Sequence, residues 1–201
     1  MIGRPLTVRP ADNPFASRRI DALAYRFSHG GVEETLDRLS RHGGRGCIVG
    51  PHGSGKTSLL EHLAERLEGR LVWVRLDTGR SNPLKTVRAS LPGRLDQRHT
   101  ILLDGAEQLG PLAWLRFHRR ARHARTIVVT SHRPGRLPTI HECTTDPGLL
   151  TELVGELAPA AVETVDLAEL FERHDGNVRL CLRELYDRWA GRGTHHRNDR
   201  R

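Results

Sequence analysis

The sequence predicts an α/β fold, with a doubly wound parallel sheet of about five strands followed by a C-terminal group of helices. Short apolar runs alternate with amphipathic helical patterns between residues 45 and 145, which is typical of a parallel sheet joined by crossover helices. The run "TILLDG" at 100–105 is almost continuously apolar, as a central strand buried on both faces should be. After Pro147 only helical patterns follow. Ligands of such sheets bind beyond the carboxyl ends of the strands, so polar residues at those ends are the candidates for function.

Each element follows from its local pattern. The segment "VEETLDRLSRH" places its apolar residues on one helical face and ends at a glycine pair. The helix at 56–69 carries a stripe of leucines, whereas Gly110 and Pro111 break the helix at 107–123 near its start. Strands are expected at 46–50, 71–76, 100–105, 126–132 and 137–144. Helices are expected at 32–42, within 77–95, and at 148–159, 166–174 and 177–191.

Four segments are expected along the chain. Prolines among polar residues make 1–18 an extended N-terminal lead-in, and 19–146 holds the alternating strands and helices. Residues 147–190 contain helices alone. Residues 191–201 are polar and basic, which is typical of a disordered tail.

The chain carries a formal charge of +8 and a pI near 10.5, which favours a nucleic acid or an acidic partner. Arginine supplies 30 of the 32 basic residues, a bias that codon composition alone can also produce. Both interpretations stay open. The helix at 108–124 is the obvious basic patch for DNA or an acidic protein, unless it is a solvated face packed by Trp114, Leu115 and Phe117. The arginines of this helix and of the position after it are Arg116, Arg119, Arg120, Arg122 and Arg125.

No stretch approaches the ~20 continuous apolar residues of a membrane span, and the N-terminus has no apolar signal core. We therefore expect no membrane partner and a cytoplasmic location. Three widely spaced cysteines, Cys47, Cys143 and Cys181, sit in apolar segments without a CxxC pair. This pattern favours buried thiols over disulfides or a zinc cluster.

A glycine-rich stretch at 50–57, "GPHGSGKT", fits the pattern G-x-x-x-x-G-K-[ST] in full. Gly53 and Gly55 let the backbone turn its N–H groups toward a phosphate chain, and the next helix adds its positive N-terminal end. Lys56 supplies a charge for the β- and γ-phosphates of ATP, and the Thr57 hydroxyl is suited to coordinate Mg²⁺. The expected nucleotide site comprises Gly50, Pro51, His52, Gly53, Ser54, Gly55, Lys56, Thr57 and Ser58.

Asp104 ends a buried strand, where it would bind Mg²⁺ through the water shell of the ion, unless it only caps the following helix. The base that activates water stays open. Many ATPases carry a glutamate directly after this aspartate, but Gly105 stands there. Glu107 reaches back to the γ-phosphate if 105–107 form a tight turn. If these residues begin a helix, Glu107 is a first-turn acid stabilised by the helix dipole.

Two further sets of polar residues end or begin elements. Thr130, Ser131 and His132 end the fourth strand, where they either contact the γ-phosphate and its water or form an ordinary strand-end turn. Asn177 caps the last helix, and Arg179 lies in its first turn. A cation there opposes the helix dipole, which hints at a bound anion.

Together these features resemble an AAA+-type P-loop ATPase, most similar to the initiator and STAND-like branches. The residues that carry the resemblance are "GPHGSGKT", "ILLDGAE", "IVVTSH" and "GNVR", in the family's order over about 15–190. The resemblance implies a P-loop NTPase fold with the helices of 147–190 as a lid. It also implies that "TSH" is a first sensor, that Arg179 contacts the γ-phosphate, and that "NPF" at 13–15 lies near adenine. A nucleotide-dependent homo-oligomer is compatible with it.

Three departures from the family pattern favour slow hydrolysis and a nucleotide-controlled switch over a motor. Gly105 replaces the usual glutamate. Only four residues, 133–136, separate the fourth and fifth strands, so the helix that commonly delivers an arginine finger has no room. Arg136 is the best remaining candidate for that role, with Arg133 next. Nothing follows the lid in the sequence, so we expect the bare nucleotide module.

Two alternatives remain beside the ATPase. A small-molecule P-loop kinase would need a carboxylate after the second strand to hold the acceptor and an arginine-rich lid, roles open to Asp77 and to Arg75 or Arg80. A scaffold that binds nucleotide without hydrolysing it would explain the glycine at 105.

Overall fold

The computed structural model describes residues 12–76 and 82–192. They form two compact units, one spanning Tyr25–Thr144 and the other joining the chain up to Ala24 with the chain from Thr145 onward. This division assigns residues 19–24 to the helical unit, whereas the sequence had suggested a boundary at 19. Most of the expected lead-in and tail lie outside the described residues.

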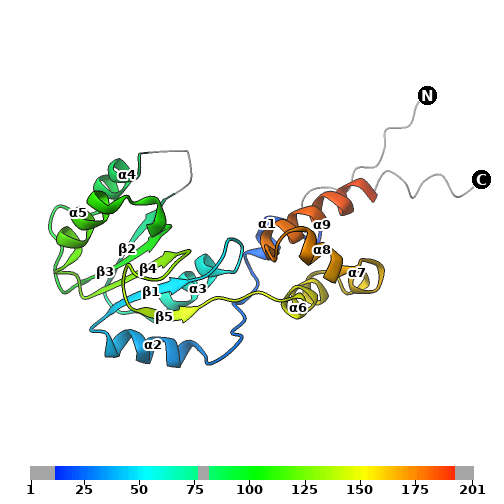
Figure 1. The fold of residues 1–201 in the computed structure, drawn as a ribbon, viewed down its shortest axis with the longest axis horizontal. Coiled ribbons are helices and arrows are strands. Elements are labelled where there is room, and N and C mark those ends of the chain that lie inside the picture. The colour runs from blue at the N-terminus through cyan, green and yellow to red at the C-terminus, as the bar shows by residue number, and fades with distance from the viewer. Residues whose placement is uncertain (1–11, 77–81, 193–201) are drawn as a thin grey trace, which may run out of the picture. The chain divides into compact units, whose positions relative to one another are not determined.

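The first unit is built on a five-stranded, all-parallel sheet with the order β2-β3-β4-β1-β5 (Figure 1). The predicted α/β class and parallel sheet are therefore confirmed. Strand ends differ from the expected ones by a residue or two, most at the weak fifth strand. The strands are β1 (Arg45–Val49), β2 (Arg70–Arg75), β3 (His99–Asp104), β4 (Thr126–Ser131) and β5 (Thr139–Glu142).

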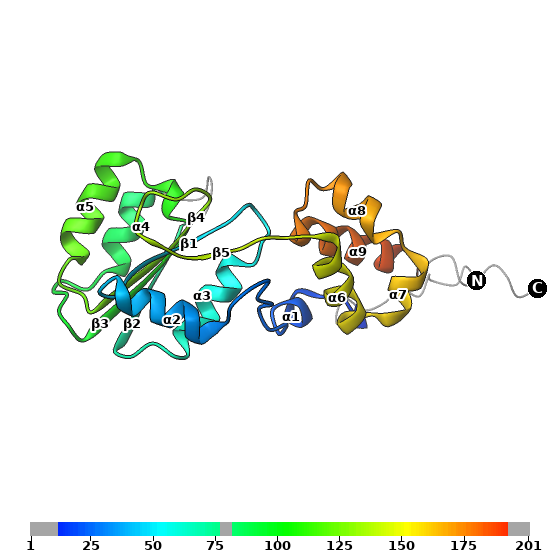
Figure 2. The ribbon, with the colours of Figure 1, turned by 60° about the horizontal axis from the view of Figure 1, so that its bottom comes forward.

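Helices cover both faces of this sheet, because successive strand residues point to opposite sides. Ile101 and Leu103 are fully buried in one apolar cluster with residues of α4 and α5, and Leu102 is fully buried in a second cluster with residues of α2 and α3. Figure 1 shows α2 on the opposite side of the sheet from α4 and α5, and Figure 2 shows α2 and α3 on the same side. The bounds are α2 (Val32–Arg41), α3 (Lys56–Ala64), α4 (Pro83–Ser90) and α5 (Pro111–Ala121).

The strand order decides which carboxyl ends are neighbours. β4 lies between β1 and β3, so it separates the strand before the glycine-rich loop from the strand that ends in Asp104. In the register, Val49 is opposite Ser131 and Leu103 is opposite Val129. The ends of the three strands therefore meet at one edge of the sheet.

The second unit is helical, with a core that includes Leu150, Val154, Leu170 and Cys181. It has one more helix than the sequence predicted after 147, because Ala158 leaves the helical conformation and Pro159 begins a new helix at its first turn. The helices are α1 (Ser17–Ile20), α6 (Pro147–Leu157), α7 (Pro159–Thr164), α8 (Leu167–Arg173) and α9 (Val178–Arg192).

The "NPF" segment belongs to this helical unit. Phe15 is 1% exposed and meets the Trp189 ring edge-on, with the ring centroids 5.8 Å apart. Asn13 accepts a hydrogen bond from the Phe15 backbone and donates one to the Tyr186 carbonyl. These contacts fasten the N-terminal segment to α9. Among the described helices none has the length and apolar character to span a membrane.

The sheet unit contains a buried histidine in β5, the strand that pairs with β1. His141 of β5 is 2% exposed, lies 3.0 Å from the Tyr25 hydroxyl through Nε2, and stacks on His29. Burial, with the nearby charges of His29 and Arg38, lowers the pKa of His141 to about 4. Its neutral form is therefore the folded form.

We expect the sheet unit to lose stability as the pH falls. Unfolded His141 has a pKa near 6.5, so the unfolded chain takes up the proton first between about pH 6.5 and 4. The resulting loss approaches about 3 kcal/mol at pH 4 and vanishes above pH 7. The measurement is urea unfolding followed by the fluorescence of Trp73 and Trp114, with Trp189 replaced by Phe.

The test variant is His141→Gln, and the matched control is His42→Gln at an exposed histidine. His141→Gln should flatten the pH dependence whatever its effect on stability at pH 7, and His42→Gln should not. Equal slopes in all three proteins would contradict the assignment.

Candidate functional site

The glycine-rich loop runs from the end of β1 into α3. Gly53 and Gly55 have φ values of +73° and +83°, in the left-handed region that favours glycine. Gly50 is packed so closely that a Cβ would lie 2.6 Å from the Cys143 carbonyl oxygen. Each of these positions therefore requires glycine for a physical reason. The loop is tightly wound, and the N-terminus of α3 lies at the inner side of the loop.

Lys56 is folded into this loop. Its side chain donates from Nζ to the carbonyl oxygens of Gly50 and Pro51, at 2.8 and 2.6 Å, and the residue is only 8% exposed. The Ser54 hydroxyl donates to the same Pro51 carbonyl at 2.9 Å. The ammonium group is thus held at the loop, where it can bind an anion in exchange for carbonyl contacts.

The Asp104 carboxylate lies between two hydroxyl groups. Thr57 donates to Oδ2 at 2.9 Å, and Thr130 donates to Oδ1 at 2.6 Å. The Thr130 hydroxyl in turn accepts from the Gly105 backbone N–H at 2.8 Å. These bonds connect the first turn of α3 with the ends of β3 and β4. A hydroxyl and a carboxylate at hydrogen-bond distance are hard oxygen ligands of the kind that Mg²⁺ prefers.

Gly105 begins the turn after β3 with φ +86°. A Cβ at this position would lie 2.7 Å from the Leu76 carbonyl oxygen, so any side chain meets backbone. A glutamate at 105 would need both a strained backbone and a displaced β2 end. The turn itself therefore excludes an acid directly after Asp104.

Glu107 lies instead in a short 3₁₀ helix, Ala106–Gln108, and its side chain turns toward the end of β4. Its Oε1 is 3.4 Å from Nε2 of His132, and its Oε2 is buried without a hydrogen-bond partner among the described residues. The His132 ring meets the His52 ring, with centroids 3.6 Å apart. Since His52 belongs to the glycine-rich loop, this chain of contacts brings Glu107 to the mouth of the loop.

The electrostatics of this group favour a neutral imidazole. Burial is the main cause that lowers the pKa of His132, and the charges of Lys56 and His52 lower it further. The Glu107 carboxylate acts in the opposite direction. Neutral His132 can accept or donate a proton at the ring nitrogen that faces Glu107.

Ser131 and Arg136 are already engaged within the sheet unit. The buried Ser131 hydroxyl accepts from the Arg133 backbone N–H at 3.4 Å, and its carbonyl accepts from the Gly50 N–H. The Arg136 guanidinium donates to the Leu109 carbonyl and lies 5.0 Å from the centroid of the Trp114 ring. Arg133 is exposed. These contacts hold Arg136 against its own unit, so of the two arginines only Arg133 extends into solvent.

Arg179 belongs to the helical unit and is exposed in the first turn of α9. Asn177 caps this helix, accepting from the Leu180 backbone N–H at 3.2 Å, and Gly176 before it has φ +74°. The cap predicted from the sequence is therefore present. The contact expected between Arg179 and a γ-phosphate stays a prediction.

The residues of the kinase alternative are only partly described. Asp77 and Arg80 lie outside the described residues. Arg75 forms an ion pair with Glu61 at 2.7 Å and lies over the Trp73 ring. Both contacts occupy the Arg75 guanidinium, so they give no support to a role of Arg75 in binding an acceptor substrate.

Two contacts were not expected from the sequence. Thr130 was expected to contact the γ-phosphate or to form a strand-end turn, but its hydroxyl bridges Asp104 and Gly105. His52 was expected within the nucleotide site, but its contact with His132 was not. The only local signal for the Thr130 bridge is a hydroxyl residue one position before the end of a central strand. No local signal indicates the contact between His52 and His132.

No protein-family model matches this chain, and no curated protein matches it either.

Replacement of Gly105 by alanine should destabilise the sheet unit more than an ordinary left-handed glycine does. The left-handed backbone costs about 1 kcal/mol, and the contact with the Leu76 carbonyl adds at least as much again. The matched control is Gly43→Ala, with φ +61° and open space around its Cβ. Urea unfolding of both variants measures the difference, and equal losses would show that the turn tolerates a side chain.

Proposed function

We propose that this protein is an ATP-binding, AAA+-like P-loop ATPase that hydrolyses ATP slowly and acts as a nucleotide-controlled switch. The observation that carries the proposal is the hydrogen bond between Thr57, at the start of α3, and Asp104, at the end of β3. A glycine-rich loop alone is a phosphate-binding element, but a loop joined to a strand-end carboxylate is also a magnesium site.

Phosphate binding is supported by the loop itself. Its left-handed glycines let the backbone turn N–H groups inward, and α3 adds the positive end of its dipole. Lys56 brings a full positive charge to the loop, where it donates to two backbone carbonyls. A phosphate oxygen is a better partner for an ammonium group than a neutral carbonyl.

Magnesium would be held by the Thr57 hydroxyl and, directly or through water, by Asp104. When bound, the ion supplies charge neutralisation for the phosphate oxygens. Thr130 fixes the Asp104 carboxylate from the other side, so the acid is oriented before any ligand arrives.

Slow hydrolysis is supported by the position of the candidate base. Gly105 cannot carry an acid, and Glu107 is the nearest carboxylate along the chain. Its buried Oε2 has no hydrogen-bond partner among the described residues, so it is the oxygen that would accept a proton from an attacking water, while Oε1 faces His132. A base that depends on a 3₁₀ turn and a histidine is less directly oriented than one on the strand end itself.

The switch part of the proposal rests on the helical unit. A cation in the first turn of α9 opposes the helix dipole unless an anion offsets it. The resemblance to AAA+ ATPases implies that Arg179 would contact the γ-phosphate, and the helical unit would then respond to the nucleotide. The proposed switch includes the exposure of a partner-binding surface by this change.

A scaffold that binds nucleotide without turnover is the second candidate, favoured by the glycine at 105. Steady-state ATP turnover distinguishes the two. The scaffold predicts that wild type turns over no faster than a Lys56→Ala variant.

We expect Lys56→Ala and Glu107→Gln to fail at different steps. Lys56→Ala should weaken ATP binding by at least about tenfold, because it removes the charge that meets the phosphates. Glu107→Gln should leave binding nearly unchanged and lower turnover by about a hundredfold, since an amide cannot accept the proton. Glu142→Gln, at an exposed carboxylate on β5, is the matched control. Normal turnover in Glu107→Gln would leave Glu107 with a structural role only.

Arg179→Ala should lower turnover and remove any nucleotide-dependent protection of the helical unit from protease. The loss of one charge-assisted contact corresponds to about tenfold in rate. Arg183→Ala, one helical turn further along α9 and also exposed, is the control. If both variants behave as wild type, Arg179 takes no part in the response to the nucleotide.

A further inference from the structure

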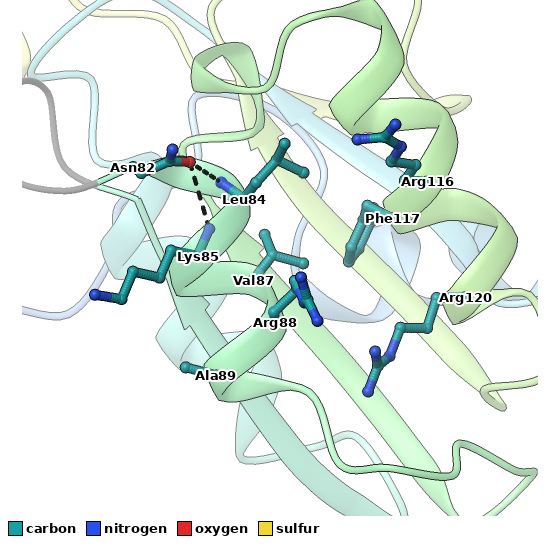
Figure 3. A pocket seen from close by; sticks show the side chains of 9 residues that line it. All are labelled: Asn82, Leu84, Lys85, Val87, Arg88, Ala89, Arg116, Phe117 and Arg120. Atoms are coloured by element: carbon teal, nitrogen blue, oxygen red, sulfur yellow. Dashed lines mark hydrogen bonds between the residues drawn. The ribbon is translucent and has the colours of Figure 1, made fainter.

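The sheet unit contains a second feature away from the glycine-rich loop, a hollow between α4 and α5 (Figure 3). Its volume is about 850 Å³, within the range of ligand-binding clefts. Figure 3 shows side chains of both helices around it. The lining residues are Asn82, Leu84, Lys85, Val87, Arg88, Ala89, Arg116, Phe117 and Arg120.

All the charged side chains that line this groove are positive. Lys85 and Arg88 come from α4, and Arg116 and Arg120 come from α5. Neither helix contains an aspartate or a glutamate. No described carboxylate forms an ion pair with any of these four cations. Such a set repels itself, so an anion in the groove would relieve unfavourable electrostatic energy.

The cations of the groove differ from an ordinary solvated charge face. On a solvated helix face, side chains diverge into water, whereas here Arg88 of α4 and Arg116 and Arg120 of α5 lie around one hollow, and only Lys85 extends away from α5 (Figure 3). Arg120 also donates hydrogen bonds to the backbone carbonyls of Leu91 and Pro92, at 3.5 and 3.0 Å. These bonds hold the Arg120 side chain at one side of the groove. Arg125, part of the same sequence patch, is instead paired with Glu68. The groove therefore uses only part of the basic patch.

The floor of the groove is apolar. Val87 and Phe117 are buried, with 4% and 1% exposed, and Leu84 is partly exposed beside them. A ligand that only carries negative charge would leave the apolar lining residues that are accessible, Leu84 and the exposed Ala89, in contact with water. The groove fits a ligand that has apolar and anionic groups on the same face.

We propose that the α4–α5 groove binds an acidic, amphipathic peptide segment of a partner protein. Carboxylates of the segment would pair with Arg88 and Arg116, whose guanidinium groups can donate bidentate hydrogen bonds, and its aliphatic side chains would cover Leu84. The long-range field of the four cations would speed the encounter.

A nucleic acid fits the groove less well. Phosphates would use the cations, but the backbone has no apolar group for the floor. The one aromatic ring in the lining, Phe117, is buried and offers no face for a base to stack on. The peptide proposal does not depend on ATP binding, because all the lining residues lie between 82 and 120, apart from the glycine-rich loop.

The test is fluorescence anisotropy of the full chain, without nucleotide, with a synthetic helical peptide that carries glutamates and leucines on one face. Three comparison probes are used: the same peptide with Gln for Glu, the same peptide with Ser for Leu, and a DNA duplex. We expect the first peptide to bind, and each peptide substitution to weaken binding by about tenfold.

Variants locate the binding on the protein. Arg88→Gln with Arg116→Gln should weaken peptide binding by about tenfold or more, and Leu84→Ser should weaken it several-fold. Arg119→Gln, an exposed change on α5 outside the groove lining, is the control and should have no effect. Circular dichroism verifies that all the variants are folded. An equal effect of Arg119→Gln, an undiminished affinity for the Ser peptide, or tighter binding of DNA that ignores Leu84→Ser would each overturn the proposal.

Discussion

The candidate site depends above all on one carboxylate held between two hydroxyl groups. Thr57 and Thr130 each donate to Asp104, and the Gly105 N–H completes the network through Thr130. Because the acid is half-buried, an unsatisfied oxygen would be costly, and both oxygens are satisfied. The strand order makes the arrangement possible. With β4 between β1 and β3, Thr130 lies where it can fix Asp104 opposite the start of α3.

The backbone of the β3 turn imposes the second constraint. A left-handed Gly105 packed on the Leu76 carbonyl leaves no room for a side chain, so the carboxylate nearest the site is two residues further along. That residue, Glu107, meets His132, and His132 meets His52 of the loop. The proposed slow chemistry follows from this displacement, whereas the proposed switch rests on Arg179 of the helical unit. The α4–α5 groove is a separate property of the same unit, since it uses the helices of one face of the sheet and no residue of the loop.

Local patterns predicted much of this fold, because apolar periodicity and glycine placement are local properties. All five strands, the helix after the glycine-rich loop and the Asn177 cap were expected, and the ends of parallel strands had to share an edge. Local patterns could not give the bridge made by Thr130, since it depends on which strands are neighbours. They also missed α7, where Pro159 restarts a helix in a segment with little periodicity. The contact between Glu107 and His132 joins the 3₁₀ helix after β3 to the segment after β4, and no sequence spacing encodes it.

The central claim is that the loop and Asp104 form one site for a magnesium nucleotide, and calorimetric titration of the wild-type chain with ATP tests it most directly. Titrations are run with Mg²⁺ and with the metal chelated. The account predicts binding in both cases, weakened by about tenfold or more without the metal, because Thr57 and Asp104 then lose the ion they would hold. No heat of binding at millimolar ATP, or an affinity that is the same with and without Mg²⁺, would contradict it.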